Sequence, residues 1–177
     1  FSFLAFGLLA ITLIIELLMP FFVYLIAPGF TEDGNKLSLT IYLTRITFPF
    51  LVFISLASFF SAILNSHNKF GLSAAAPIIL NIILIFILYF LKYENDQLVT
   101  YLAYGVSIAG LIQLIILFLS AKKFFPSKIK INFKINKNIK LFFNKLFPSI
   151  FSSGVTQINI LVGTIIASFQ ANAVSYL

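Results

Sequence analysis

Two ionisable residues, Glu16 and Arg45, lie within long hydrophobic stretches of this sequence. Of all its residues, these two are the clearest candidates for a chemical role. An ionised group at membrane depth is costly unless it is paired or hydrated, so such groups usually mark an ion pathway, a substrate contact or a coupling site. A carboxylate and a guanidinium also form strong, directional hydrogen bonds with each other. We therefore hypothesise that Glu16 pairs with Arg45, or with a cation elsewhere in the protein.

Catalytic chemistry has little support in the remaining residues. The sequence contains no cysteine, which excludes disulfides, thiolate metal sites and thiol nucleophiles. His67 is the single histidine, so a histidine metal cluster is impossible, and an interfacial role is favoured over a catalytic one. Glycine-rich phosphate loops and intramembrane carboxylate pairs are also missing from the sequence. We expect a protein that is not an enzyme and that needs no cofactor or metal.

The composition is that of a membrane protein. Of the 177 residues, 60% are hydrophobic and 10% are charged, and the mean hydropathy is +1.07. Soluble domains have about 45–50% apolar and about 25% charged residues, so a water-soluble globule could not bury this much apolar surface. The first apolar run opens on Phe1 and lacks the basic region and cleavage site of a signal peptide. We expect it to be a true span, in a fragment of a longer chain.

Five stretches are long enough, or nearly so, to cross a hydrocarbon core, which needs about 20 helical residues. Helices are expected because lipid offers no partner for backbone polar groups. Three of the four connections are short, so successive helices should pack as antiparallel neighbours. The predicted fold is all-α, a polytopic transmembrane helical bundle of five spans, at about residues 1–27, 38–64, 72–91, 98–121 and 148–169.

The distribution of lysine predicts the orientation of these spans. Lys69 lies in the second connection, whereas Glu32 and Asp33 make the first connection net acidic, and Glu94 and Asp96 do the same for the third. The fourth connection holds eight lysines and no acid: Lys122, Lys123, Lys128, Lys130, Lys134, Lys137, Lys140 and Lys145. Because basic loops stay in the cytoplasm, the second and fourth connections are expected there.

The fourth connection, residues 122–147, is expected to lie on the membrane surface. Apolar and basic side chains alternate from Ile139 to Phe147, which predicts a short helix in the headgroup layer. Anionic membrane lipid is the expected partner of residues 122–145. Nucleic-acid binding is the alternative for such a basic run, but its position beside a span disfavours that alternative.

Polar side chains of the fifth span gather on one helical face, which includes Ser152 and Thr156, with Gln157 and Asn159 at its edges. This face either packs closely on a neighbouring helix through small residues, among them Gly163, Ala167 and Ala171, or lines a hydrated cavity. The second span carries a weaker stripe of the same kind, composed of Thr40, Thr44, Thr47, Ser55, Ser58, Ala62 and Asn65. Pro20 and Pro49 are predicted to kink the first and second spans.

Depth in the membrane is compatible with a pair between Glu16 and Arg45. At about 1.5 Å per residue, Glu16 lies about 16 Å and Arg45 about 10 Å from the outer connection. Long side chains on adjacent antiparallel helices could bridge that difference. The alternative is that Arg45 extends to the outer interface and that Glu16 is protonated.

Short motifs follow one another along the chain in an order that resembles one known family. They are Ala27-Pro28-Gly29-Phe30, Arg45-Ile46-Thr47-Phe48-Pro49-Phe50, Ser55-Leu56-Ala57-Ser58, Ala62-Ile63-Leu64-Asn65-Ser66-His67, Lys69-Phe70, Ala76-Pro77, Leu80-Asn81-Ile82, Gly110 with Gln113, and Ala167-Ser168-Phe169. In these motifs the sequence resembles the MurJ/MviN family, the lipid II flippases of the multidrug/oligosaccharidyl-lipid/polysaccharide exporter superfamily.

This resemblance implies a fold and a function. The five spans would be the third to seventh of fourteen helices, and so a partial N-terminal lobe of an exporter-type fold. The expected function is alternating-access translocation of the lipid-linked peptidoglycan precursor, an undecaprenyl diphosphate, across the bacterial cytoplasmic (inner) membrane. The family's substrate-binding arginines belong to helices outside this sequence, so no diphosphate site is assigned. Glu16 does not match a family position, and Arg45 fits a basic position near the outer interface.

Six residues are the candidates for contacts in a substrate cavity: Glu16, Arg45, Ser152, Thr156, Gln157 and Asn159. One alternative is a related exporter of another polyprenyl-linked saccharide or of a cationic drug, although a drug exporter would be expected to use several cavity carboxylates. The other alternative is a non-transporting membrane scaffold that binds partners through its basic loop.

Overall fold

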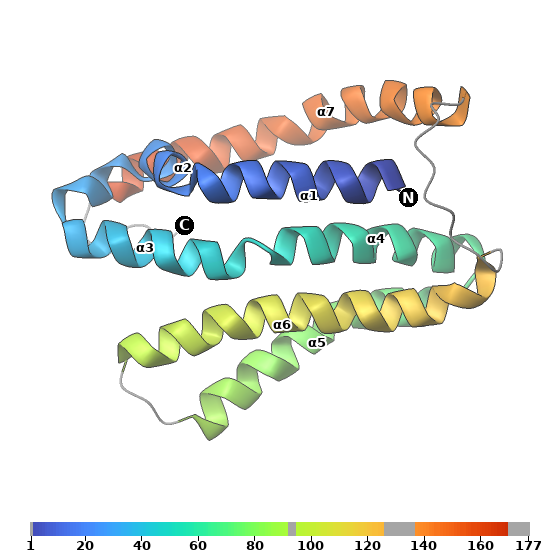
Figure 1. Ribbon diagram of the computed structural model, residues 1–177, viewed down its shortest axis with the longest axis horizontal. Coiled ribbons are helices and arrows are strands. Elements are labelled where there is room, and N and C mark those ends of the chain that lie inside the picture. The colour runs from blue at the N-terminus through green and yellow to red at the C-terminus, as the bar shows by residue number, and fades with distance from the viewer. Residues whose placement is uncertain (1, 92–94, 126–136, 170–177) are drawn as a thin grey trace. The chain divides into compact units, whose positions relative to one another are not determined.

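The computed structural model describes residues 2–91, 95–125 and 137–169, and within these ranges every regular element is a helix (Figure 1). The elements are α1 (Ser2–Leu17), α2 (Met19–Ile26), the 3-10 helix η1 (Pro28–Glu32), α3 (Gly34–Thr47), α4 (Phe50–Ser66), α5 (Phe70–Phe90), α6 (Asn95–Ala121), the 3-10 helix η2 (Lys122–Phe124) and α7 (Lys137–Ser168). The predicted all-α class is confirmed for these residues.

Three helical segments of the described chain are long and apolar enough to cross a membrane. They are Gly34–Ser66, which combines α3 and α4, Phe70–Phe90 and Gln97–Phe124. Two bent helix pairs also qualify when each is taken as one span, namely Ser2–Leu17 with Met19–Ile26, and Ile139–Phe151 with Ser153–Ser168. The chain is therefore a multi-pass membrane protein with three to five candidate spans.

Both prolines that were predicted to kink a span lie at a helix break. The chain leaves the helical conformation at Leu18, and Pro20 occupies the first turn of α2, where its missing N–H costs no hydrogen bond. Between α3 and α4 the break falls at Phe48 and Pro49, and Pro49 is the N-cap residue of α4. The two predicted kinks are confirmed as breaks.

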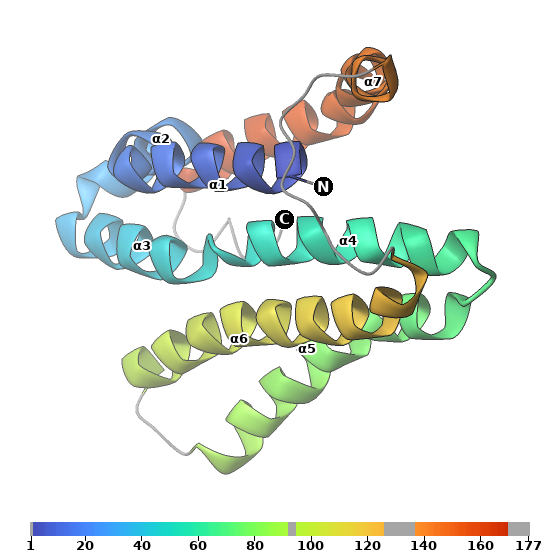
Figure 2. The ribbon, with the colours of Figure 1, turned by 45° about the vertical axis from the view of Figure 1, so that its right-hand side comes forward.

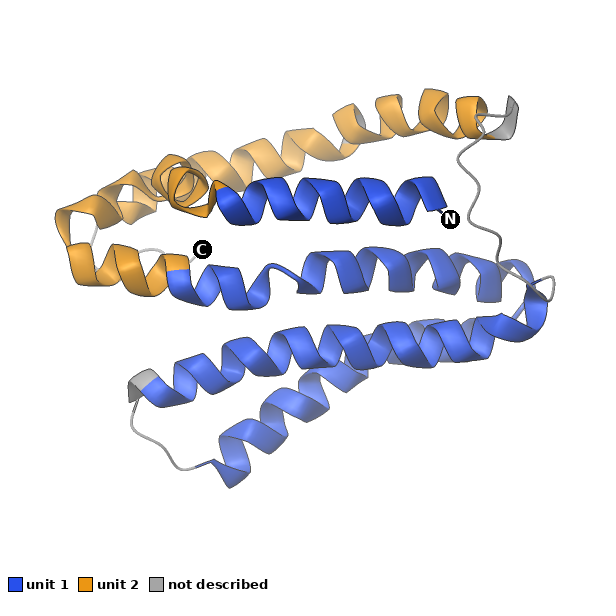
Figure 3. Cartoon of the chain, viewed as in Figure 1, with its two compact units in different colours: residues 1–17, 42–131 blue, residues 18–41, 132–177 orange. Residues whose placement is uncertain are grey.

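The chain divides into two compact units, one of residues 1–17 and 42–131 and the other of residues 18–41 and 132–177 (Figure 3). In the first unit α4, α5 and α6 pack side by side, as both ribbon views show (Figures 1 and 2). Their buried core consists of Ala57, Phe60, Leu64, Ala76, Leu117 and Ala121. The Phe60 ring meets the Phe118 ring at 5.2 Å between centroids, which joins α4 to α6.

Two glycines of α6 allow this close packing. A Cβ atom at Gly110 would lie 2.5 Å from a ring carbon of Phe50 and 3.3 Å from the Cβ of Phe53 on α4. A Cβ atom at Gly105 would overlap the Ile87 side chain of α5. Small residues let helices approach in lipid, where association depends on van der Waals packing rather than on the hydrophobic effect.

In the second unit the backbones of η1 and α7 lie in close contact. α2 and η1 both contact α7, and the backbone N–H of Gly29 donates a buried hydrogen bond of 3.0 Å to the Ser168 hydroxyl. A Cβ atom at Gly29 would overlap the backbone of Ser168 and Phe169. Gly29 is therefore required for the close approach of η1 to α7, although its own backbone angles are ordinary.

Substitution of Gly29 tests that contact in the full-length protein. Gly29→Ala should lower the free energy of unfolding by about 1–3 kcal/mol, because the added methyl forces the two backbones apart. Ser168→Ala should cost about 1 kcal/mol, the net contribution of one hydrogen bond. Thermal unfolding in detergent is the measurement.

The matched control is Gly154→Ala in α7, where a Cβ atom would meet nothing within 4 Å. This variant should keep the parent Tm or raise it slightly, because alanine is the better helix former. Equal melting of Gly29→Ala and Gly154→Ala would show that the Gly29 contact is not needed.

Candidate functional site

The six candidate residues fall into two groups, one in each compact unit. Glu16 and Arg45 belong to the first unit. Ser152, Thr156, Gln157 and Asn159 belong to α7 in the second unit. The side chain of Ser152 lies outside the described residues. Each group is described on its own.

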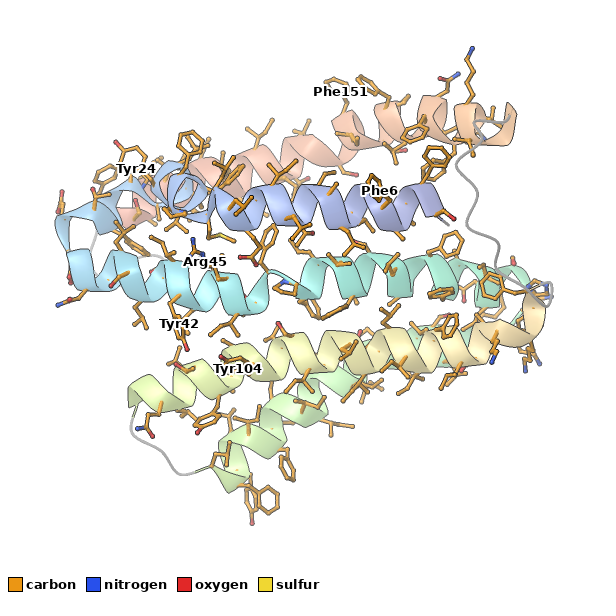
Figure 4. The ribbon with its side chains drawn as sticks, in the orientation of Figure 1. Phe6, Tyr24, Tyr42, Arg45, Tyr104 and Phe151 are labelled. Carbon is orange, nitrogen blue, oxygen red and sulfur yellow. The ribbon has the colours of Figure 1, made fainter. Side chains whose placement is uncertain are left out.

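Glu16 and Arg45 come close together within the first unit. Glu16 lies in the last turn of α1 and is half-buried, whereas Arg45 lies in the last turn of α3 and is exposed. Figure 4 shows the Arg45 side chain on the side of α3 that faces α1. The guanidinium acts electrostatically on the Glu16 carboxyl, although the two side chains form no direct ion pair within 4.0 Å. A charge interaction of this kind gains strength where water is scarce.

The helix break beside Arg45 changes the hydrogen bonding of the backbone. Pro49 has no N–H with which to bond the carbonyl of Arg45, four residues earlier. Beyond the break, the N–H of Leu51 donates to the Phe48 carbonyl at 3.0 Å, one residue short of the helical pattern. The hydroxyl of Ser107 on α6 donates to the carbonyl of Ile46. A side chain from a neighbouring helix thus compensates a broken helix, as expected at membrane depth.

A pair of tyrosines forms a second polar link between α3 and α6. The hydroxyl groups of Tyr42 and Tyr104 are hydrogen-bonded to each other, and Figure 4 shows the two side chains facing one another. Tyr42 therefore points toward α6, whereas Arg45, three residues later, points toward α1. The end of α3 presents polar groups to both of its neighbours in the first unit.

Hydroxyl groups of the second-span stripe bond mainly to their own helix. Thr47 donates to the carbonyls of Leu43 and Thr44, both at 3.1 Å, and Ser58 donates to the carbonyl of Ile54 at 2.8 Å. Such groups are satisfied without water. The stripe therefore does not require a hydrated cavity, and its bonds to the backbone are of the kind that bend helices.

The polar face of α7 divides into a packed end and an uncovered middle. Ala167 and Ser168 are buried, in agreement with close packing through small residues. Thr156, Gln157 and Asn159 are exposed, and none of them has a hydrogen-bond partner in the described part of the chain. Side-chain amides at membrane depth need a polar partner or water. The described chain therefore covers neither the polar nor the apolar side chains in the middle of α7.

Several polar contacts were not anticipated from the sequence. Gln113 is 1% exposed, and its side-chain carbonyl accepts no hydrogen bond from the described residues. The spacing of Gly110, Gln113, Leu117 and Ala121 places all four on one face of α6, and that periodicity is the signal that could have identified Gln113 as buried. Contacts between distant residues, such as Ser107 with Ile46 and Tyr42 with Tyr104, have no signal in a single sequence.

A family profile described as lipid II flippase MurJ matches residues 1–177. The chain belongs to the MurJ family. The resemblance seen in the short motifs is therefore confirmed, and it extends over residues 1–177 of this chain.

Individual relatives agree with this assignment. The chain is 38% identical over 175 residues to a probable lipid II flippase MurJ of Rhizobium tropici, covering 96% of this chain and 33% of the relative. It is 35% identical to a probable lipid II flippase MurJ of Rickettsia prowazekii, covering 100% of this chain and 35% of the relative. A lipid II flippase MurJ of Burkholderia cenocepacia is 31% identical, with 82% and 29% covered. The chain thus spans about a third of the length of these MurJ relatives.

A double-mutant cycle tests the interaction of Glu16 with Arg45. We expect Glu16→Gln and Arg45→Gln together to cost less stability than the sum of the single substitutions, with a coupling of about 0.5–3 kcal/mol. Equilibrium unfolding of the full-length protein in detergent measures the coupling. Arg45→Lys, which keeps the charge, should retain part of it. Additive effects would exclude the pair.

Cysteine labelling distinguishes the two interpretations of the α7 face. In a cysteine-free full-length background, Thr156→Cys and Asn159→Cys should react with a membrane-impermeant maleimide, because both side chains are exposed and polar. Ile158→Cys, on the apolar face, should react at least about tenfold more slowly, since thiolates form poorly in lipid. Equal protection of all three positions would show that the face is packed rather than hydrated.

Proposed function

We propose that this chain is part of a lipid II flippase that moves the lipid-linked peptidoglycan precursor, of the undecaprenyl diphosphate type, across the bacterial cytoplasmic (inner) membrane. The observation that carries the proposal is the match of residues 1–177 to the MurJ family, together with relatives named as lipid II flippases. The work is translocation without covalent chemistry, so the protein is a transporter rather than an enzyme.

The fold proposed for the whole protein has fourteen helices, of which this chain supplies five spans of the N-terminal lobe. Three single candidate spans and two bent helix pairs support the count of five. The breaks at Leu18 and Pro49 are features that transporters tolerate where the freed backbone groups find partners within the protein. The proposed boundaries of the spans are residues 1–27, 38–64, 72–91, 98–121 and 148–169.

Physical chemistry explains why such a protein needs polar groups inside its spans. A diphosphate with attached sugars and peptide cannot cross about 30 Å of hydrocarbon without losing its hydration, which is very costly for charged groups. A protein lowers this cost by offering hydrogen-bonding groups in two alternating conformations, whose populations the substrate shifts by binding them differently. The protein then needs only a polar path and a change of access.

We assign the six candidate residues to that path: Glu16, Arg45, Ser152, Thr156, Gln157 and Asn159. The guanidinium of Arg45 suits phosphate or carboxylate oxygens. The amides of Gln157 and Asn159 suit sugar hydroxyls and peptide groups, because an amide both donates and accepts hydrogen bonds. Glu16 would set the charge near Arg45. Residues 122–145 are proposed to rest on anionic membrane lipid through their lysines.

Depletion of the full-length protein in cells tests the function. We expect the lipid-linked peptidoglycan precursor to accumulate on the cytoplasmic side, where it is protected from a membrane-impermeant hydrolase added outside. The fraction cleaved should fall several-fold on depletion and recover when the protein is supplied again.

Other outcomes would contradict the proposal. Normal translocation with mislocalised partner proteins would indicate a scaffold, and accumulation of a different polyprenyl-linked saccharide would indicate a related exporter. In the restored strain, Glu16→Gln separates the roles of single residues. If translocation and its pH dependence do not change, the Glu16 carboxylate has no coupling role.

A further inference from the structure

An aromatic stack at one end of the first unit joins the connection after α4 to η2, which follows α6. The imidazole of His67, which follows α4, stacks on the ring of Phe124 in η2, with centroids 4.1 Å apart and planes 25° apart. Phe125 contacts Phe60 at 5.7 Å between centroids, and Phe124 and Phe125 both pack against the buried core. The ends of α4 and α6 and the beginning of α5 meet here in both ribbon views (Figures 1 and 2).

Hydrogen bonds fix the orientation of the His67 ring. Its Nδ1 atom lies 2.9 Å from the Ile63 carbonyl and 3.1 Å from the Ser66 hydroxyl. A carbonyl only accepts, so Nδ1 carries a proton and donates it there. The other ring nitrogen, Nε2, has no hydrogen-bond partner in the described chain. Asn68 then adopts a left-handed conformation, with φ of 58°, and Lys69 is the N-cap residue of α5.

Three lysines lie next to the stacked residues in the sequence. Lys69 is two residues from His67, and Lys122 and Lys123 immediately precede Phe124; all three are exposed. The Nζ atom of Lys123 lies 5.2 Å from the centre of the Phe124 ring. Because the stack joins the two segments, it brings their lysines to the same end of the bundle. No acidic residue occurs between Asp33 and Glu94 or after Asp96, so nothing in the adjoining sequence neutralises them.

Exposed apolar side chains follow Lys69 in the sequence. Phe70 and Leu72 begin α5 and are 57% and 47% exposed. A positive charge next to exposed aromatic and aliphatic groups at the end of a membrane helix matches an anionic lipid, whose phosphate and acyl chains lie in the same order. A free phosphate would use the lysines but not the apolar surface.

We propose that Lys69, Lys122 and Lys123, whose segments are joined by the stack of His67 on Phe124, bind the phosphate of an anionic phospholipid such as phosphatidylglycerol. These five residues are called here the basic aromatic cluster. The acyl chains run along the exposed beginning of α5. Diffuse attraction of lipid to residues 122–145 would need no defined geometry, whereas this cluster is held in place by the aromatic core. The site does not depend on which lipid-linked substrate the protein moves.

Lipid retention by the full-length protein tests the site. In nanodiscs that contain equal amounts of phosphatidylglycerol and phosphatidylethanolamine, native mass spectrometry should show preferential retention of phosphatidylglycerol. Each lysine near an anionic membrane surface contributes a factor of about five. The combined variant Lys69→Gln, Lys122→Gln and Lys123→Gln should therefore lose the preference by about a hundredfold, to background. The corresponding triple arginine variant should keep it.

Matched controls distinguish lipid binding at this site from nonspecific electrostatic attraction of lipid to the protein. Lys36 also lies over a phenylalanine ring, with Nζ 4.1 Å from the centre of Phe30, but Glu32 and Asp33 are close to it in sequence. Lys36→Gln should leave lipid retention unchanged. The triple glutamine variant should also melt like the parent in nanodiscs of phosphatidylethanolamine alone, which shows that its loss of lipid is not loss of fold.

Three results would overturn the proposal. They are equal retention of the two lipids by the parent, undiminished retention of phosphatidylglycerol by the triple glutamine variant, and displacement of phosphatidylglycerol by millimolar inorganic phosphate. The last would show that the lysines bind a free anion. None of these readouts involves transport, so failure here is distinct from failure of the flippase proposal.

Discussion

The constraint on which the rest of this structure depends is that a backbone hydrogen-bonding group in lipid must find its partner within the protein. A helix without an internal proline, such as α6, meets this constraint along its length by its own backbone hydrogen bonds. Where Pro49 interrupts the second span, the Ser107 hydroxyl of α6 bonds the carbonyl of Ile46. A hydrogen bond from α6 thus stabilises the break. Gly105 and Gly110 allow α6 to approach α5 and α4 closely.

The same constraint explains where the polar side chains are found. Hydroxyl groups within the spans donate to the preceding turn of their own helix, as Thr47, Ser58 and Thr164 do. Such residues can be numerous because each is satisfied locally. Amides and charges cannot be satisfied in this way, and they are few. Gln157, Asn159 and Arg45 are exposed, so the other described helices do not cover them.

Much of the fold could be predicted because hydropathy and proline act locally. The apolar stretches, the breaks near Pro20 and Pro49 and the helix from Ile139 onward follow from residue types within one or two turns. The ends of the helices depend on more than hydropathy. The helical segment predicted from residue 38 runs from Gly34 to Ser66, and α7 runs from Lys137 to Ser168 with a bend of 41° between Phe151 and Ser153. Contacts across the fold, such as His67 with Phe124 or Gly29 with Ser168, depend on packing between residues far apart in sequence.

Glu16 and Arg45 lie close in sequence to the two points where the chain passes between its compact units. The chain passes from the first compact unit to the second at Leu18 and returns at Tyr42. Glu16 lies two residues before the first passage and Arg45 three residues after the second. Both residues belong to the first unit, so an attraction between them acts inside that unit, between the last turn of α1 and the last turn of α3. It adds a long-range electrostatic contact to two helices whose backbone hydrogen bonds are local.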